Sequence, residues 1–375
     1  MRTNRKREMT RFHISASRTE YEKSREDKLY SSYSSDISGL ISQLPNGSYF
    51  DPEHKLVVLR LPHVLDLGAA ARSSTISIAN KCREAIFLHR RRVCLDFSAT
   101  KRVSAAATLF LLAEIWRCRH AAGKGMLTGT YPEDARLHRQ LQDCGFFGLL
   151  GVRERLSKNT QSYPVEWIRA ISEKSAQGKQ VVELEKALLG PDLSLQPTHR
   201  QALYIALSEA MTNVVQHAYP PLEKFPKRSP VDPRRWWMLG HVHAEQQEVR
   251  VVFMDQGIGI PRHLPRKHTM EHIRAMLSLL PGFEPDDAQM IRASMLVGRT
   301  STGLTNRGKG MKQLRKILEE AGAGKLRILS NAGEYEYTGS RAERLTNYSD
   351  SIRGTLIEWR VPLLALDLLS NEVQP

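Results

Sequence analysis

The sequence has few cysteines and no long apolar run, and both absences narrow the classes of protein it can belong to. Its four cysteines form no C-x-x-C pair, so neither a zinc site nor a redox motif is predicted. Cysteines scattered in this way are typical of a reducing cytosol, and we expect them to be buried and unbridged. No apolar segment approaches the roughly 20 residues that span a bilayer, so no membrane association is expected. The basic start of the chain lacks the apolar stretch of a secretory signal, and we expect a cytoplasmic protein.

Acidic residues are also in short supply. The chain has 55 Lys and Arg against 40 Asp and Glu, which gives a net charge of +15 and a pI of about 9.7. This balance favours anionic partners such as phosphates, nucleic acid or an acidic protein. The basic residues are scattered, for example in "HRRR" (89–92) and "RKH" (266–268), and no basic stripe is interleaved with aromatics. Specific nucleic-acid binding is therefore not expected, and a solvated basic surface is favoured.

Composition and periodicity divide the chain into two folded regions. In the first, predicted strands at 55–62, 92–98 and 125–132 alternate with predicted helices at 68–90, 105–123 and 133–146. Such alternation indicates an α/β layer built from crossover units. The predicted segments are a flexible basic tail (1–45), a first domain (46–151), a linker (152–195), a second domain (196–365) and a short tail (366–375).

The second region opens with a helix that carries an unusual polar stripe. Thr198 and Gln201 suggest a capping box at its start. Within "SEAMTNVVQHAYP" (208–220), Glu209, Asn213 and His217 are spaced four residues apart, so they lie above one another on one helix face. The stripe borders the apolar face of the helix, and it is predicted to line a pocket. Taken alone, it could also be a solvated helix surface.

Two glycine turns and a late strand follow. Predicted strands at 235–244 and 248–255 lead into "DQGIGIP" (255–261), "NRGKGMKQ" (306–313) opens a helix, and further strands are predicted at 325–331, 334–339 and 354–362, the last beginning "GTLIEW". Glycines let the backbone approach a ligand closely, and a helix N-terminus favours anions. The Walker spacing of P-loop proteins is absent.

These four elements, in this order, resemble the Bergerat-fold (GHKL, histidine-kinase-like) ATPases, and most closely the serine kinases of bacterial anti-sigma type. The resemblance covers about 195–365 and implies an α/β sandwich, a mixed sheet covered by helices, that binds ATP and Mg²⁺. Hard oxygen ligands suit Mg²⁺, which favours the Asn213 amide as the metal ligand. A carboxylate one turn away suits a general base, which favours Glu209 as the catalytic residue.

The resemblance also assigns the remaining cofactor-binding residues. Asp255 would accept a hydrogen bond from the adenine amino group, and Thr355 would lie near the adenine. The other predicted nucleotide contacts are His217, Gly257, Gly259, Arg307, Gly308, Lys309 and Gly310. The stretch from about 262 to 305 would form a mobile lid over the nucleotide.

The first region, with "CLDFSATKRVSAAATLF" (94–110), resembles the STAS domain of anti-anti-sigma proteins. In that family a hydroxyl before the helix accepts a regulatory phosphate. Here the matching position is Ala106, which has no oxygen, so a degenerate STAS-like domain is expected. Ser104 stands in the place of the family's acid and is the alternative acceptor.

The sequence therefore predicts an Mg-ATP-binding bacterial signalling regulator. The favoured activity is that of a serine/threonine protein kinase acting on a regulatory protein partner, either sigma-factor-like or STAS-type. The alternative is an ATP-gated clamp or nucleotide sensor that hydrolyses ATP slowly and phosphorylates no protein. A homodimer is also compatible with the resemblance.

Overall fold

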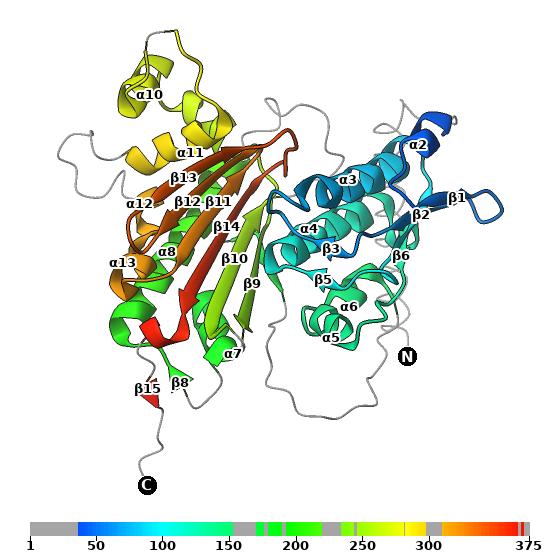
Figure 1. Cartoon of the computed structure of the whole chain (residues 1–375), viewed down its shortest axis with the longest axis horizontal. Helices are drawn as coiled ribbons and strands as arrows, with labels where there is room; N and C mark the ends of the chain where they lie inside the picture. Colours follow the sequence, from blue (N-terminus) through cyan, green and yellow to red (C-terminus); the bar gives the residue numbers. More distant parts are fainter. Residues whose placement is uncertain are drawn as a thin grey trace, which may run out of the picture.

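The structure, a computed structural model, has two α/β units that lie side by side (Figure 1). It describes residues 37–152, 170–175, 179–189, 193–219, 234–243, 246–280, 282–297, 310–366 and 369–370. The predicted mixture of helices and sheets is confirmed. No helix in these ranges combines the length and the apolar character needed to cross a bilayer. All four cysteines are free, and Cys82, Cys118 and Cys144 are buried.

The first unit contains a four-stranded sheet in the order β1-β2-β4-β6. β1 pairs antiparallel with β2, whereas β2, β4 and β6 pair in parallel, as the alternation of strands and helices predicted. Smaller elements are α2 (Ser38–Ser42), β3 (Val64–Leu65) and β5 (Arg102–Val103). The main elements are β1 (Tyr49–Asp51), β2 (Leu56–Arg60), α3 (Arg72–Arg83), β4 (Arg92–Asp96), α4 (Ala105–Ala122), β6 (Leu127–Gly129), α5 (Ala135–Asp143) and α6 (Phe146–Leu150).

The second unit is built on a seven-stranded sheet in the order β13-β12-β11-β14-β10-β9-β7. All six strand pairs are antiparallel, so the prediction of a mixed sheet is wrong for this unit. Short connections such as 331–332 join neighbouring strands, and short connections allow only antiparallel pairing. The strands are β7 (Ile171–Glu173), β9 (Trp236–His243), β10 (Glu248–Asp255), β11 (Lys325–Ser330), β12 (Gly333–Thr338), β13 (Glu343–Asn347) and β14 (Thr355–Pro362).

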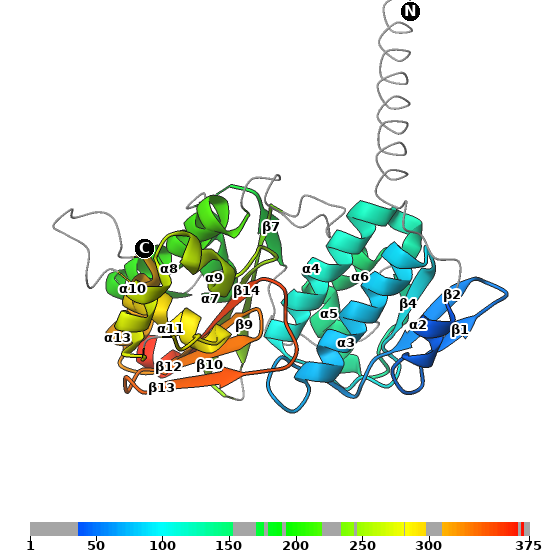
Figure 2. The same ribbon diagram turned by 90° about the horizontal axis from the view of Figure 1, so that it is seen from above.

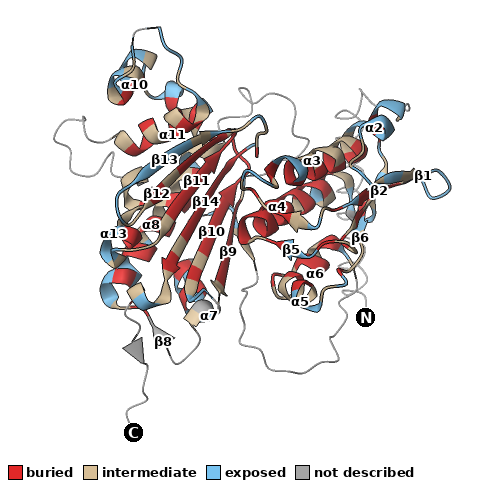
Figure 3. Cartoon of the chain, viewed as in Figure 1, coloured by how far each residue is buried: buried red, intermediate tan, exposed pale blue. Residues whose placement is uncertain are grey.

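The two faces of this sheet are covered by different parts of the chain (Figures 1 and 2). Val251 and Phe253 of β10 pack in one apolar cluster with α8 (Pro197–Asn213). Val252 and Met254, which point the other way, pack in a second cluster with α4 of the first unit. Both faces of the central strands are therefore buried, as the colouring in Figure 3 shows.

Three elements fall within the stretch predicted as a linker, 152–195. β7 pairs with β9 at the edge of the large sheet, and α7 (Lys179–Leu189) places Val181 and Leu184 in the same cluster as α8. A further pair, β8 (Leu193–Ser194) and β15 (Leu369–Ser370), joins the start of the second unit to its end. Residues of this stretch thus contribute to the second unit.

The start of α8 differs from the prediction. Its N-cap is Gln196, and no side chain caps it, so the capping box of Thr198 and Gln201 is wrong. Pro197 occupies the first turn of the helix, where its fixed φ and missing N–H are tolerated. The helix therefore begins two residues earlier than a Thr198 cap would require.

Much of the stretch predicted as a mobile lid, 262–305, is helical and has a small core of its own. The chain there forms α9 (Ile260–His263), α10 (Met270–Leu277) and α11 (Asp287–Leu296). Helices α10 and α11 and the turn Leu264–Arg266 share a small core of Leu264, Ile273, Leu277, Met290 and Ala293. An apolar core of this kind fixes helices against one another. The remainder of the predicted lid, 298–305, lies outside the described residues.

Candidate functional site

A cavity of about 370 Å³ opens between α8, the end of β10 and the helices α9 and α11. Its volume lies in the range of small-molecule pockets. Three distant parts of the sequence contribute the predicted site residues that line it, and these are Glu209, Asn213, His217, Asp255, Gly259 and Thr355. The structure thus brings together six of the eleven predicted residues around one space.

The polar stripe forms one wall of the cavity. Asn213 ends α8, and the chain continues as a π-helical turn (Val214–Ala218) that carries His217. Asn213 Nδ2 donates a hydrogen bond of 2.9 Å to Glu209 Oε1. Within the described residues no group donates to the Asn213 amide oxygen, which leaves it able to bind a cation. Burial raises the pKa of Glu209, which makes this carboxylate a better proton acceptor.

Asp255 lies at the deep end of the cavity and is only 6% exposed. Burial raises its pKa from 3.8 to about 7, although the backbone N–H groups of Gly257 and Thr355 oppose the shift. The Gly257 N–H donates to Asp255 Oδ1 over 2.7 Å. Thr355 stands directly opposite Asp255 in the β10–β14 pairing, and its hydroxyl is 3.0 Å from that of Ser330. The site therefore offers a strong hydrogen-bond acceptor close to the Thr355 hydroxyl, which also lines the cavity.

The two glycines after Asp255 are explained by close contacts and, at Gly259, by a positive φ. A Cβ on Gly257 would lie 2.3 Å from the carbonyl oxygen of Ala218, so no side chain fits there. Gly259 has φ +80° and would meet the Asn331 side chain at 2.6 Å. Gly257 does not line the cavity but lets the loop lie against the end of the π-helical turn, and Gly259 forms part of the lining.

A second wall was not predicted from the sequence. His263, Lys267 and His268 also line the cavity. Lys267 Nζ lies 3.1 Å from His217 Nε2, and the rings of His217 and His263 stack at 4.8 Å. Burial, with Lys267 as a further cause, lowers the pKa of both rings, that of His263 to about 4. At neutral pH these rings are therefore uncharged, and Lys267 supplies the positive charge of this wall.

The sequence contained a signal for this wall, because "RKH" (266–268) follows the glycine pair closely. Lys267 is exposed, as the prediction of a solvated basic surface implied, but it and His268 also line the cavity. The helical turns after Gly259 fold it back over the end of α8, so the two side chains face the cavity.

The second glycine turn is only partly described. Gly310 begins α12 (Gly310–Gln313), and Met311 lines the cavity. Arg307, Gly308 and Lys309 lie outside the described residues. The apolar part of the lining consists chiefly of Val214, Phe253, Ile260, Leu264, Val297 and Ile357. This arrangement suits a ligand with a flat apolar part that carries a hydrogen-bond donor, together with an anionic part near Lys267.

The two positions of the first unit that were considered as phosphate acceptors, Ala106 and Ser104, both lie at the start of α4. Ala106 is buried inside α4. The Ser104 hydroxyl caps α4 by accepting a hydrogen bond from the Ala107 N–H at 3.2 Å. The hydroxyl thus has a structural role at a helix start.

In comparisons with known proteins, no family model matches the chain and no curated protein matches it significantly in sequence.

Proposed function

We propose that the chain is an Mg-ATP-dependent regulator that phosphorylates a serine or threonine of a partner protein. The observation that carries the proposal is the meeting of Glu209, Asn213 and Asp255 in one cavity of about 370 Å³. A buried acceptor, an amide oxygen suited to Mg²⁺ and a carboxylate with a raised pKa are the groups that adenine recognition and phosphoryl transfer need.

Adenine fits the deep end of the cavity. Its amino group would donate to the Asp255 carboxylate, and the ring would pack between apolar side chains such as Phe253 and Ile260. A buried ionised carboxylate is unfavourable without a partner, so a donor from the ligand would stabilise it. The residues present therefore fit an adenine base.

The metal would be held with few protein ligands. Among the described residues no cluster of three or more His, Cys, Asp or Glu side chains could hold a metal ion. Mg²⁺ often takes one or two protein oxygens and completes its shell with phosphate and water. Asn213 offers such an oxygen, and its orientation is fixed by the hydrogen bond to Glu209. Bound Mg²⁺ would neutralise charge on the phosphates during transfer.

Phosphoryl transfer would use Glu209 as general base. The partner's hydroxyl oxygen forms a bond to the γ-phosphorus, while the bond from that phosphorus to the β,γ-bridging oxygen breaks. The hydroxyl proton passes to the Glu209 carboxylate, and ADP leaves. Lys267 also lines the cavity, 3.1 Å from His217 Nε2, where its charge would stabilise the phosphates.

Radiolabelled ATP tests the proposal directly. The purified chain is incubated with γ-labelled ATP, Mg²⁺ and candidate regulatory proteins, and label is followed on protein and as free phosphate. Label on a partner's serine or threonine is expected, and Glu209→Gln should abolish it while ATP still binds. Free phosphate without labelled protein would instead assign the chain an ATP-hydrolysing clamp function. If calorimetry detects no binding of ATP or ADP, the proposal fails altogether.

A further inference from the structure

The first unit covers the face of the large sheet that lies opposite α8, and the contact is extensive (Figure 2). Trp116 of α4 meets Trp237 of β9 edge-on, with ring centroids 5.6 Å apart. One apolar cluster runs from the first sheet through α4 to Leu239, Met254 and Leu356 of the second unit. Burial of this extent indicates a fixed contact between the units rather than a flexible tether.

A buried polar contact links this interface to the candidate site. Glu114 of α4 is 4% exposed, and its carboxylate accepts hydrogen bonds from Arg83 and Arg117. Its Oε1 also accepts a hydrogen bond of 2.9 Å from Gln256 Nε2. Gln256 directly follows Asp255, the last residue of β10, and its side chain contacts α4 whereas Asp255 lines the cavity. The first unit thus holds the residue next to the predicted adenine contact.

A second contact reaches the same loop from α3. Arg72 Nη2 donates to the Asn331 carbonyl oxygen at 3.1 Å and to that of Asp350 at 3.0 Å. The Asn331 side chain donates in turn to the Ile258 carbonyl oxygen at 3.0 Å. It also fills the space beside Gly259. The loop from Asp255 to Gly259 is therefore held from behind at two points.

We propose that the first unit positions this loop for nucleotide binding, with Gln256 and Asn331 as positioning residues. The inference rests on the proposed ATP binding and adds that the STAS-like unit sets the affinity of the site. The physical basis is preorganisation, because a loop already fixed in its binding shape loses less conformational entropy on binding. A partner or modification that shifts α4 would then change the affinity for ATP.

Two substitutions test the proposal. Gln256→Met keeps the length of the side chain but removes its hydrogen bond to Glu114, which keeps its two arginine partners. Asn331→Gly removes the bond to Ile258, and glycine tolerates the positive φ of 52° at this position. Each variant should weaken ATP binding about fivefold, the effect of one net hydrogen bond. The preference for ATP over GTP should fall by a similar factor, since the loop carries Asp255.

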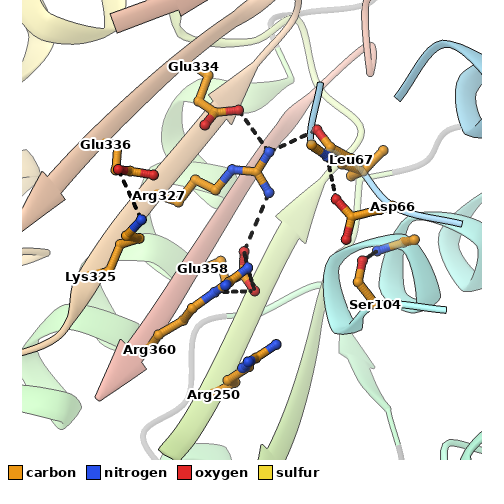
Figure 4. Close-up of polar contacts among 12 residues, drawn as sticks. Asp66, Leu67, Ser104, Arg250, Lys325, Arg327, Glu334, Glu336, Glu358 and Arg360 are labelled. Carbon is orange, nitrogen blue, oxygen red and sulfur yellow. Dashed lines mark hydrogen bonds and ion pairs between the residues drawn. The ribbon is translucent and has the colours of Figure 1, made fainter. Parts of the chain in front are cut away.

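Arg327→Gln is the matched control. Arg327 Nη2 also crosses the interface, donating to the Leu67 carbonyl oxygen and to Glu334, each at 2.8 Å (Figure 4). It makes no contact with residues 255–259, and after the substitution Glu358 keeps Arg360 and Glu334 keeps Tyr348. This variant should lose thermal stability but keep the ATP affinity and base preference of the wild type.

Calorimetry well below the melting temperature of each variant separates the outcomes. Weaker ATP binding and lower base preference in Gln256→Met and Asn331→Gly, with Arg327→Gln unchanged, would support the proposal. Equal losses in all three variants would overturn it, because they would indicate a general loosening of the interface. Wild-type affinity in the first two variants would overturn it as well. Failure of the wild type to bind ATP would refute the proposed function, and this inference with it.

Discussion

The burial of Asp255 predicts how the stability of the protein depends on pH, and this prediction can be tested without a ligand. Its carboxyl group is inside the protein, and burial raises its pKa from 3.8 to about 7. A raised carboxyl pKa means that the native state binds a proton more tightly than the unfolded state does. The protonated Asp255 carboxyl group therefore stabilises the native state fully at pH values below its pKa in the unfolded state. This stabilisation is lost as the pH rises to about 7. Replacing Asp255 by Asn should remove this loss.

The magnitude follows from the shift. A rise from 3.8 to about 7 corresponds to about 4 kcal/mol, at about 1.4 kcal/mol for each pH unit. Between about pH 5 and pH 8 the free energy of unfolding of the wild type should therefore fall by about 3 kcal/mol relative to Asp255→Asn. The quantity compared is the difference in unfolding free energy between variant and wild type at about pH 8, minus the same difference at about pH 5. The substitution also alters the hydrogen bonds from the Gly257 and Thr355 N–H groups to this side chain. That change alters the free energy of unfolding equally at both pH values, so it cancels in the comparison.

Urea unfolding of the two proteins at both pH values, followed by circular dichroism, measures this quantity. The unfolding free energy of the variant minus that of the wild type should increase as the pH rises. At about pH 8 the variant should also bind ATP about 10- to 100-fold more weakly, because it lacks the charged acceptor. A difference that stays constant from pH 5 to pH 8 would show that Asp255 is not a buried, titrating acid, and the argument for its role would be refuted.

Three further predictions concern the same cavity. Wild-type ATP affinity should fall by up to about tenfold from about pH 8 to pH 6, because ionised Asp255 accepts the amino group more strongly than the protonated carboxyl does; calorimetry at several pH values checks this, and a flat profile contradicts it. Glu209→Gln should keep ATP affinity within about threefold and lower turnover by about 10²- to 10⁴-fold in a phosphate-transfer assay, and equal loss of binding would remove its assignment as base. Gly257→Ala should lose ATP binding and melt at a lower temperature, because its Cβ would meet the Ala218 carbonyl; Gly125→Ala, where a Cβ meets nothing within 4 Å, is the control, and similar behaviour of the two variants would contradict the steric argument.

Much of the fold could be predicted because it depends on local pattern. The helix predicted at 105–123 is α4, which ends at Ala122 before Gly123, and the strand predicted at 248–255 is β10. β13 was missed because four of its five residues are exposed, so no apolar alternation marks it. β7 was missed because three residues give too short a pattern; only its pairing with β9 makes it a strand.

The sequence by itself determined the local spacing of part of the candidate site. Spacing of four on a helix places Glu209, Asn213 and His217 in one line, and the glycines after Asp255 allow a close turn. Both are properties of a few consecutive residues, so they can be inferred without the rest of the chain.

Only the tertiary structure decided which of these groups meet and what holds them. Lys267 reaches His217 across 50 residues, and Gln256 reaches Glu114 across 142. No periodicity in the sequence specifies such pairs, because they depend on how two separately formed units pack on the two faces of one sheet. The covering of the sheet by α4, which places a buried carboxylate behind the candidate site, is therefore a fact of the packed structure alone.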